Sequence, residues 1–233
     1  MKFPEPLQTG TLIKRYKRFL ADIELESGEI ITIHCPNTGS MKNCAEPGSQ
    51  VWFSDSHNEK RKYRYTWEIV AVAAKAKAGI NTGLANKLVL EALKKDKVEA
   101  LAGYPVIRTE VKYGAENSRI DLLLESETEQ CFVEVKSVTL GEGKVAYFPD
   151  AVTTRGHKHL RELMAMKAEG HRAVLFFCVQ HTGVSEVRPA DSIDPQYGQL
   201  LREAIGCGVE VIAMRARIDS SAILLDKMVP VTF

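Results

Sequence analysis

Two stretches decide the fold of this chain: Ser118-Arg119-Ile120-Asp121-Leu122-Leu123-Leu124 and Cys131-Phe132-Val133-Glu134-Val135-Lys136-Ser137-Val138. Both have the length and composition of strands, and the polar residues 125–130 between them predict a β-hairpin. Because side chains alternate along a strand, Glu134 and Lys136 share one face, whereas Val133 and Val135 point into a core. Asp121 joins the two charged residues if the register places the start of the first strand beside the end of the second.

Two acids and a lysine in this pattern indicate a metal-dependent phosphodiesterase site. The carboxylates of Asp121 and Glu134, with the carbonyl of Val135, are hard oxygen ligands that suit Mg²⁺ or Mn²⁺. The ammonium of Lys136 can orient a water or stabilise charge in the transition state. The alternative is that these residues are ordinary charges on the wet face of a hairpin.

The order of the neighbouring elements favours the first interpretation. Periodicity and capping residues predict a helix over Thr82 to Ala100, begun by Asn81 or Thr82, and a second helix from Thr153 or Thr154 to about Ala168. Apolar runs predict buried or half-buried strands on either side of the hairpin. The expected strands are Val106 to Tyr113, Arg172 to Val179 and Val209 to Ile218, with a third helix over Gln196 to Ile205 before the last of them.

This order, with Asp on the second strand and Glu-x-Lys on the third, resembles the PD-(D/E)xK nuclease superfamily over roughly Asn81 to Ile218. The resemblance implies a restriction-endonuclease-like mixed sheet flanked by helices. Members often supply a further metal-ligating acid from the first helix, so Glu91 is the candidate third carboxylate. Glu91 is equally well explained as a surface charge paired with Lys87 or Lys95 at helical spacing.

The whole chain resembles a narrower family, sugar fermentation stimulation protein A. The resemblance lies in His34-Cys35-Pro36-Asn37-Thr38-Gly39-Ser40-Met41, in the two hairpin strands, and in Phe148-Pro149-Asp150-Ala151-Val152-Thr153-Thr154-Arg155-Gly156-His157-Lys158-His159-Leu160. It implies an α+β or α/β protein with two domains, an oligonucleotide-binding (OB-fold-like) barrel over 1–80 and a nuclease-like domain over 81–233. It also implies DNA binding and a role in regulating sugar metabolism, notably that of maltose.

The first part of the chain, taken by itself, reads as a small β-barrel. Ser27-Gly28 predicts a tight hairpin turn, and no convincing helix interrupts the strands. Propensity alone leaves an OB fold and an SH3-like barrel both open. The expected strands are Thr11 to Tyr16, Phe19 to Glu26, Glu29 to Cys35, Gln50 to Asp55 and Lys62 to Ala73.

Basic residues interleaved with aromatics mark two candidate nucleic-acid contacts on this barrel. The first cluster is Lys14, Arg15, Lys17 and Arg18, and the second is Lys60, Lys62 and Arg64. On a nucleic-acid binder such residues contact phosphates, and an exposed aromatic ring stacks on a base. The alternative is a strand with a solvated charged face and an aromatic core face.

Two further segments offer anion contacts. The loop 36–41 presents Asn37 and Ser40, although any turn uses the same residue types. Arg155 and Lys158 lie at the start of the second expected helix, where the helix dipole disfavours cations unless an anion is bound. A bound phosphate is one interpretation of these cations, and the less favoured alternative is surface charge that the helix dipole opposes.

Composition bounds the remaining possibilities. The net charge is only +1, but residues up to Ile80 hold 12 Lys and Arg against 9 Asp and Glu. No apolar stretch reaches the roughly 20 residues of a membrane span, and the start of the chain lacks a signal-peptide core. Composition therefore favours a cytoplasmic protein without a membrane partner. DNA as the partner, bound without strong sequence preference, is what the family resemblance implies, and the formation of a homo-oligomer stays open.

Two functions follow as hypotheses. The first is a DNA-binding protein with a Mg²⁺-dependent nuclease centre at Asp121, Glu134 and Lys136. The second is a non-catalytic DNA-binding regulator that retains the nuclease fold, since fold alone does not imply activity. All three motif residues are present, which favours the first. A sugar-metabolising enzyme lacks support, because the chain has neither a phosphate-binding loop nor paired acids in a glycosidase-like setting.

Overall fold

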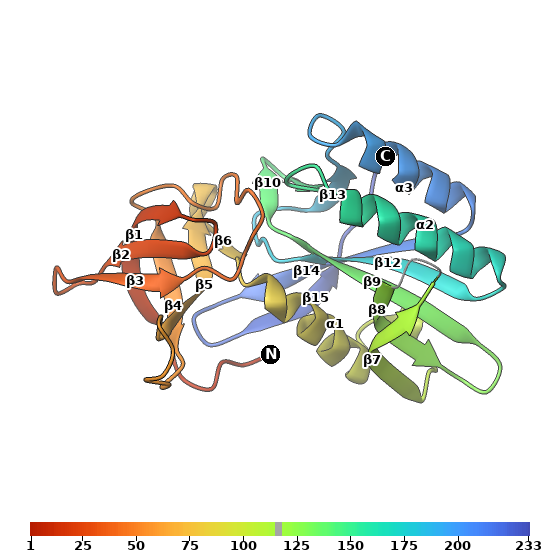
Figure 1. Ribbon diagram of the computed structural model, residues 1–233, viewed down its shortest axis with the longest axis horizontal. Coiled ribbons are helices and arrows are strands. Elements are labelled where there is room, and N and C mark those ends of the chain that lie inside the picture. The colour runs from red at the N-terminus through yellow and green to blue at the C-terminus, as the bar shows by residue number, and fades with distance from the viewer. Residues whose placement is uncertain (115–117) are drawn as a thin grey trace.

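A closed barrel forms the first part of the chain in a computed structural model, which describes residues 1–114 and 118–233 (Figure 1). Its sheet has the order β3-β2-β1-β4-β5-β6, and a further pairing of β3 with β5 closes it. The strands are β1 (Gln8–Tyr16), β2 (Leu20–Glu24), β3 (Ile30–His34), β4 (Gln50–Asp55), β5 (Tyr65–Val72) and β6 (Ala76–Gly79).

The barrel is held together by the inward-facing residues of these alternating strands. Leu12, Ile23, Ile33 and Phe53 are each at most 1% exposed and lie in one apolar cluster. Trp67 is fully buried in the same cluster and donates its indole N–H to the carbonyl of Ile69. The expected small barrel is therefore confirmed.

Two expectations about the barrel are corrected. Lys62 and Arg64 do not lie on a strand, because β5 begins only at Tyr65 and the preceding residues form a turn-rich loop. The segment after the last expected strand contains β6, which pairs with β5. Short Ala- and Lys-rich strands carry little β propensity, so tertiary pairing decides this one.

A mixed sheet of six strands forms the core of the second part, in the order β15-β14-β12-β9-β8-β7. β12 runs parallel to both of its neighbours, and the outer pairings are antiparallel. The strands are β7 (Val106–Tyr113), β8 (Ser118–Glu125), β9 (Gln130–Val138), β12 (Arg172–Val179), β14 (Glu210–Ile218) and β15 (Ile223–Met228).

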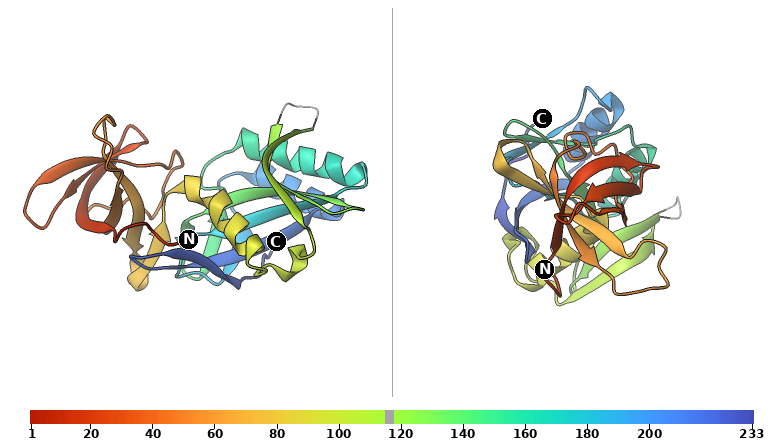
Figure 2. Two further views of the ribbon diagram at one scale, coloured as in Figure 1. Left: turned by 90° about the horizontal axis from the view of Figure 1, so that it is seen from below. Right: turned by 90° about the vertical axis from the view of Figure 1, so that its left-hand side faces the viewer.

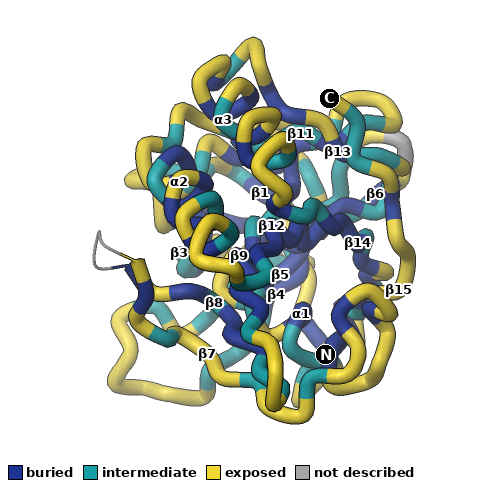
Figure 3. Tube along the Cα trace, turned by 90° about the vertical axis from the view of Figure 1, so that its right-hand side faces the viewer, coloured by how far each residue is buried: buried dark blue, intermediate teal, exposed yellow. Residues whose placement is uncertain are grey.

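Helices cover both faces of this sheet, as Figure 2 shows. α1 (Ala85–Lys94) packs against Val133, Val135 and their neighbours on one face. α2 (Thr154–Ala168) and α3 (Pro195–Gly206) pack on the other face, where Phe132 and Phe177 are buried. In Figure 3 the central strands are the most deeply buried part of the domain. The expected mixed sheet flanked by helices is confirmed.

The first helix is shorter than the sequence predicts. Asn81 caps a 3-10 turn over Thr82–Leu84, and α1 then ends at Lys94 instead of continuing to Ala100. Asp96 has a positive φ of 52°, which stops helical propagation after a polar run. Further 3-10 turns cover Glu99–Leu101 and Ala73–Lys75.

A second, smaller sheet was not expected from the sequence. It has the order β10-β11-β13 and forms within segments where no strand is expected from the sequence. With three or four residues each, these strands are too short to show a side-chain period. They are β10 (Leu140–Glu142), β11 (Val145–Phe148) and β13 (Glu186–Pro189).

Polar contacts join the barrel to the second part of the chain. Lys42 pairs with Glu142 at 2.8 Å, and Asn43 donates to the carbonyl of Gly141 at 3.2 Å. The first residues of the chain run back to the large sheet, where the amide of Phe3 donates to the carbonyl of Ser221. The expected division at residue 80 stays a prediction, although these contacts cross it. Within the described ranges, no helix is both long and apolar enough to cross a membrane.

Candidate active site

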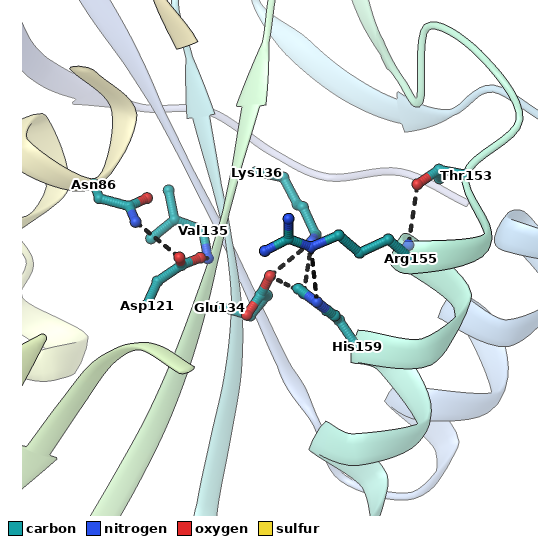
Figure 4. A network of polar contacts seen from close by, with 9 residues as sticks. Asn86, Asp121, Glu134, Val135, Lys136, Thr153, Arg155 and His159 are labelled. Carbon is teal, nitrogen blue, oxygen red and sulfur yellow. Dashed lines mark hydrogen bonds and ion pairs between the residues drawn. The ribbon is translucent and has the colours of Figure 1, made fainter. Parts of the chain in front are cut away.

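The candidate site lies where β8 and β9 separate (Figure 4). Their pairing runs from Glu125↔Gln130 to Leu122↔Val133, so Asp121 and Glu134 follow the last paired residues. Glu134 and Lys136 face α2, whereas Val133 and Val135 lie in the cluster packed on α1. The alternation predicted for this strand is confirmed.

A change of side-chain direction at Asp121 brings it to this point. Ile120 packs in the cluster beneath α2, yet Leu122, two residues later, packs in the cluster beneath α1. Residues two apart on a regular strand share a face, so β8 departs from regular alternation between them. The partner strand is irregular at the same level, where Glu110 has a φ of 55°.

Asp121 binds the neighbouring strand and α1 at once. Its Oδ2 accepts from the backbone N–H of Val135 at 2.8 Å, and its Oδ1 accepts from the amide of Asn86 at 2.7 Å. The N–H and carbonyl of one strand residue point to the same side. The carbonyl of Val135 is therefore directed to the side of the strand on which Asp121 lies.

Glu134 is the most enclosed residue of the site, with 2% of its side chain exposed. Its Oε1 accepts from Lys136 Nζ at 2.7 Å and also contacts Nδ1 of His159 on α2. Arg155, one turn earlier on the same helix, donates from Nε to His159 Nε2 at 3.2 Å. The charged residues of β9 and α2 thus form one connected network.

The environment shifts the two carboxyl groups in opposite directions. Burial, followed by repulsion from Glu134, raises the pKa of Asp121. Burial alone also raises the pKa of Glu134, but Lys136 and His159 outweigh it and hold that pKa below its ordinary value. Glu134 is therefore the carboxylate that stays ionised more readily.

The donor set fits a hard divalent cation. Oε2 of Glu134 is buried and, within the part of the chain that the structure describes, has no hydrogen-bond partner. A buried carboxylate oxygen without a partner is costly unless a ligand or proton satisfies it. With Asp121 and the Val135 carbonyl, it offers the oxygen ligands that Mg²⁺ and Mn²⁺ accept.

The structure does not bring Glu91 to this site. Its carboxylate pairs with Lys95 and, at 2.6 Å, with the amino group of Met1. α1 instead reaches Asp121 through Asn86, five residues earlier and on another face of the helix. These contacts agree with the alternative interpretation, in which Glu91 is a surface charge paired with Lys95 at helical spacing.

Asn37 and Ser40 lie in residues 36–41, here called the interdomain loop, which follows β3 and contacts Asp150 of the second part of the chain. Asn37 is 3% exposed, and its side chain accepts from the amide of Gly39, so it serves as a turn residue. Ser40 is exposed and donates to Asp150 at 3.2 Å. Arg15 donates to the carbonyls of Arg18, Asn37 and Gly39, and this binds the first basic cluster to the loop.

The two basic clusters differ in their surroundings. Lys17 and Arg18 are exposed at the β1–β2 turn, whereas the Nζ of Lys14 lies 3.6 Å from the carboxylate of Asp22.

In the second cluster, Lys60 and Lys62 are exposed. Arg64 is engaged by both oxygens of Asp55, whose pKa it lowers to about 2. Tyr65 packs edge-on against Phe53, which fits the alternative of an aromatic core face.

A groove of about 590 Å³ connects the first basic cluster with the start of α2. One wall contains Arg15 and Arg18 from the barrel, and the other contains Phe148, Val152 and Thr153. Thr153 caps α2 by accepting from the amide of Gly156 at 3.0 Å. The groove therefore ends at the helix terminus that carries Arg155 and the half-buried Lys158.

Sequence reasoning missed two residues of the network. Asn86 precedes the buried Val89 by three residues, so helical spacing places it on the inward face. A polar residue on the inward face of a helix is a sequence signal that could have identified Asn86 as part of a site. His159 follows Arg155 by four residues, and this spacing shows that both share a face without showing which strand they meet.

Comparisons with known proteins cover the whole chain. The sequence model described as "Sugar fermentation stimulation protein RE domain" matches residues 83–222, and "SfsA N-terminal OB domain" matches residues 13–80. The second match decides between the OB and SH3-like barrels. Sugar fermentation stimulation protein homologs from Teredinibacter turnerae and Geobacter metallireducens are 62% and 57% identical, over 99% of this chain and 99% of each relative.

A solved structure extends the likeness to three dimensions. Pyrococcus furiosus SfsA in complex with Ca²⁺ has a TM-score of 0.89 and 29% sequence identity. The alignment covers 100% of this chain and 98% of that chain. The arrangement of the barrel and the larger domain is thus common to both proteins.

Proposed function

The chain belongs to the sugar fermentation stimulation protein A family, and from this premise and the geometry of the site we propose a DNA-binding protein with a divalent-metal phosphodiesterase centre. The observation that carries the proposal is the buried Oε2 of Glu134, which has no hydrogen-bond partner among the described residues, on the strand that also carries Lys136. A charged oxygen in that position calls for a cation. The Ca²⁺ bound by the Pyrococcus furiosus relative supports a divalent ion.

The roles follow from position. Asp121, Glu134 and the carbonyl of Val135 would hold Mg²⁺ or Mn²⁺, which when bound supplies an activated water and neutralises phosphate charge. Lys136 orients the attacking water and stabilises the negative charge that develops on phosphorus oxygens. Asn86 fixes Asp121 through its 2.7 Å hydrogen bond.

The groove supplies the second half of the proposal. A nucleic-acid strand lying along it would meet Arg15 and Arg18 first and the terminus of α2 last. Arginine side chains bind phosphates electrostatically, and the affinity of this binding falls as the salt concentration rises. Arg155 and Lys158 would bind the phosphate next to the metal centre. The negative charge of that phosphate would compensate for the two cations at a helix start, where the helix dipole disfavours them.

Cleavage assays test the proposal. Purified protein is incubated with single-stranded DNA, duplex DNA and RNA, each with Mg²⁺, Mn²⁺ or a chelator. We expect cleavage that needs the metal and is lost in Asp121→Asn and Glu134→Gln. Wild-type protein that cleaves none of these substrates above the chelator control, across pH, would reject the nuclease function.

Lys136→Ala separates catalysis from binding. Because Lys136 stabilises charge in the transition state, we expect turnover to fall by about 10²- to 10³-fold. The affinity for uncleaved DNA, measured with a chelator present, should change little. Lys144→Ala removes an exposed lysine from the β10–β11 turn and is the control. Equal losses of turnover in both variants would remove Lys136 from the catalytic machinery.

A non-catalytic DNA-binding protein that regulates sugar metabolism is the second candidate. The observation that favours it is that α1 contacts Asp121 through the amide of Asn86. Nucleases of the PD-(D/E)xK superfamily often carry a metal-binding acid on the corresponding helix. Two protein carboxylates instead of three hold a cation less tightly. DNA binding with unchanged affinity in Asp121→Asn, and without cleavage in the wild type, would decide for this candidate.

A further inference from the structure

His159 is a buried histidine whose two nitrogens are both engaged in the site network. Its side chain is 6% exposed and lies between β9 and the start of α2. Nδ1 contacts Oε1 of Glu134, and Nε2 receives the Nε–H of Arg155 at 3.2 Å. Figure 4 shows His159 between these two partners.

The partners of His159 determine which nitrogen carries the proton. The guanidinium of Arg155 stays protonated and only donates, so Nε2 must accept. A neutral imidazole that accepts at one nitrogen donates from the other, and Nδ1–H therefore points at Glu134. Lys136 Nζ lies 3.1 Å from Nδ1 but directs its hydrogen bond to Glu134, where both donors meet on Oε1.

Saturation of one oxygen leaves the other one for a ligand. Oε1 of Glu134 holds two donors, whereas Oε2 is buried and has no partner among the described residues. With Lys136 alone, a carboxylate can rotate and exchange its two oxygens. A second donor on the same oxygen, held by the helix α2, removes that freedom.

We propose that His159 is a positioning residue that fixes the Glu134 carboxylate with Oε2 presented to the divalent ion, and that Arg155 sets the tautomer this requires. The inference rests on the proposed function, since it assumes that Glu134 is a metal ligand. Partners of a ligating side chain typically change metal affinity or activity by about 10- to 100-fold when removed.

A neighbouring histidine provides a matched control. His157 lies on the same helix, its side chain is 7% exposed, and its Nε2 donates to the Asp194 carboxylate at 2.9 Å. It has no contact with Glu134 that the structure records. Both histidines hold α2 in place, but only His159 touches the proposed ligand.

The experiment compares three variants at one fixed pH. His159→Leu removes the donor, and His159→Asn keeps an N–H near the position of Nδ1. His157→Asn is the control. Calorimetric titration with Mn²⁺ alone measures metal affinity, thermal unfolding measures stability, and cleavage rates separate kcat from KM.

We expect Mn²⁺ affinity to fall about 10- to 100-fold in His159→Leu and to recover most of that loss in His159→Asn. His157→Asn should unfold at a lower temperature with unchanged Mn²⁺ affinity. Loss of cleavage in His159→Leu should appear mainly in kcat. If His159→Leu does not fold, the comparison of His159→Asn and His159→Gln takes its place, because Gln carries its N–H near Nε2 instead.

The outcomes separate this inference from the proposed function. Unchanged Mn²⁺ affinity in folded His159→Leu, or equal losses in the Asn and Gln variants, would overturn the positioning role. Wild-type protein that binds Mn²⁺ without cleaving nucleic acid would reject the reaction and leave the positioning role supported by the affinity data. Wild-type protein that binds no Mn²⁺ would overturn both.

Discussion

Asp194 is the residue that connects the starts of α2 and α3. Its carboxylate accepts from the amide of Thr153 at 2.9 Å, from the amide of Tyr197 at 3.0 Å, and contacts His157. Only 2% of the residue is exposed. One carboxylate therefore caps α3 and anchors the loop before α2, the helix that carries Arg155 and His159.

This capping makes stability depend on pH. Burial raises the pKa of Asp194, but the two amides and His157 outweigh it and hold the folded pKa below 3.8. A depressed pKa stabilises the folded state above the unfolded value, and the contribution is lost as pH falls through the lower folded pKa. Asp194→Asn should therefore lower the free energy of unfolding at pH 7 by about 2 kcal/mol.

The difference between wild type and Asp194→Asn should shrink as pH falls below about 4, because the wild-type carboxyl then gains its own proton. Urea denaturation at several pH values measures it. Asp191→Asn is the control, since Asp191 is exposed and pairs with Arg202 at the surface. A pH-independent difference for Asp194→Asn would contradict the assignment.

At the scale of elements, the start of α2 decides where the proposed catalytic network lies. Thr153 accepts from the amide of Gly156, and the first helical turn then carries Arg155. A side chain on Gly156 would clash, because a Cβ there lies 2.6 Å from Thr153 and 3.1 Å from Tyr197. The cap and this close approach fix the angle at which α2 meets β9.

Thr153→Ala removes the cap. We expect the free energy of unfolding to fall by about 1 kcal/mol, as the amide of Gly156 loses its acceptor. Thr153→Ser keeps the hydroxyl and should stay closer to wild type. Chemical denaturation of both variants measures the effect, and equal stabilities would show that the hydroxyl contributes nothing.

At the scale of the whole molecule, the contacts between barrel and sheet create one surface from two parts of the chain. The interdomain loop contacts Asp150 through Ser40 and the amide of Met41, each at 3.2 Å. This holds the β1–β2 turn near the start of α2. A basic cluster that looks isolated in the sequence thereby becomes one wall of the groove.

Lys17→Ala with Arg18→Ala tests the β1–β2 turn, whose Arg18 lines the groove. We expect weaker DNA binding. Because two phosphate contacts are lost, the slope of log K against log salt concentration should become less steep by up to about 2. Lys94→Ala with Lys97→Ala makes the same change in net charge near the end of α1 and is the control. Fluorescence anisotropy at several salt concentrations gives both quantities.

Equal slopes in the two double variants would contradict a local contact. Lys60→Ala with Lys62→Ala, measured beside them, tests whether the second basic cluster contributes. That cluster stays a prediction, since its arginine is already held by Asp55.

The sequence by itself determined most of the longer strands, the order of the three helices and the central motif. Alternation placed Glu134 and Lys136 together, because residues two apart on a regular strand share a face. Capping residues placed the start of α2, because a hydroxyl and an amide three residues later interact locally. Long, specific motifs indicated the family, which the comparisons confirm.

Only the tertiary structure decided which residues meet. The short strands β6, β10, β11 and β13 form by pairing with distant segments, so local propensity does not reveal them. Asn86 instead of Glu91 reaches Asp121, because the rotation of α1 on the sheet is set by packing. His159 reaches Glu134 for the same reason. Spacing fixes which residues share a face, and packing alone fixes what that face contacts.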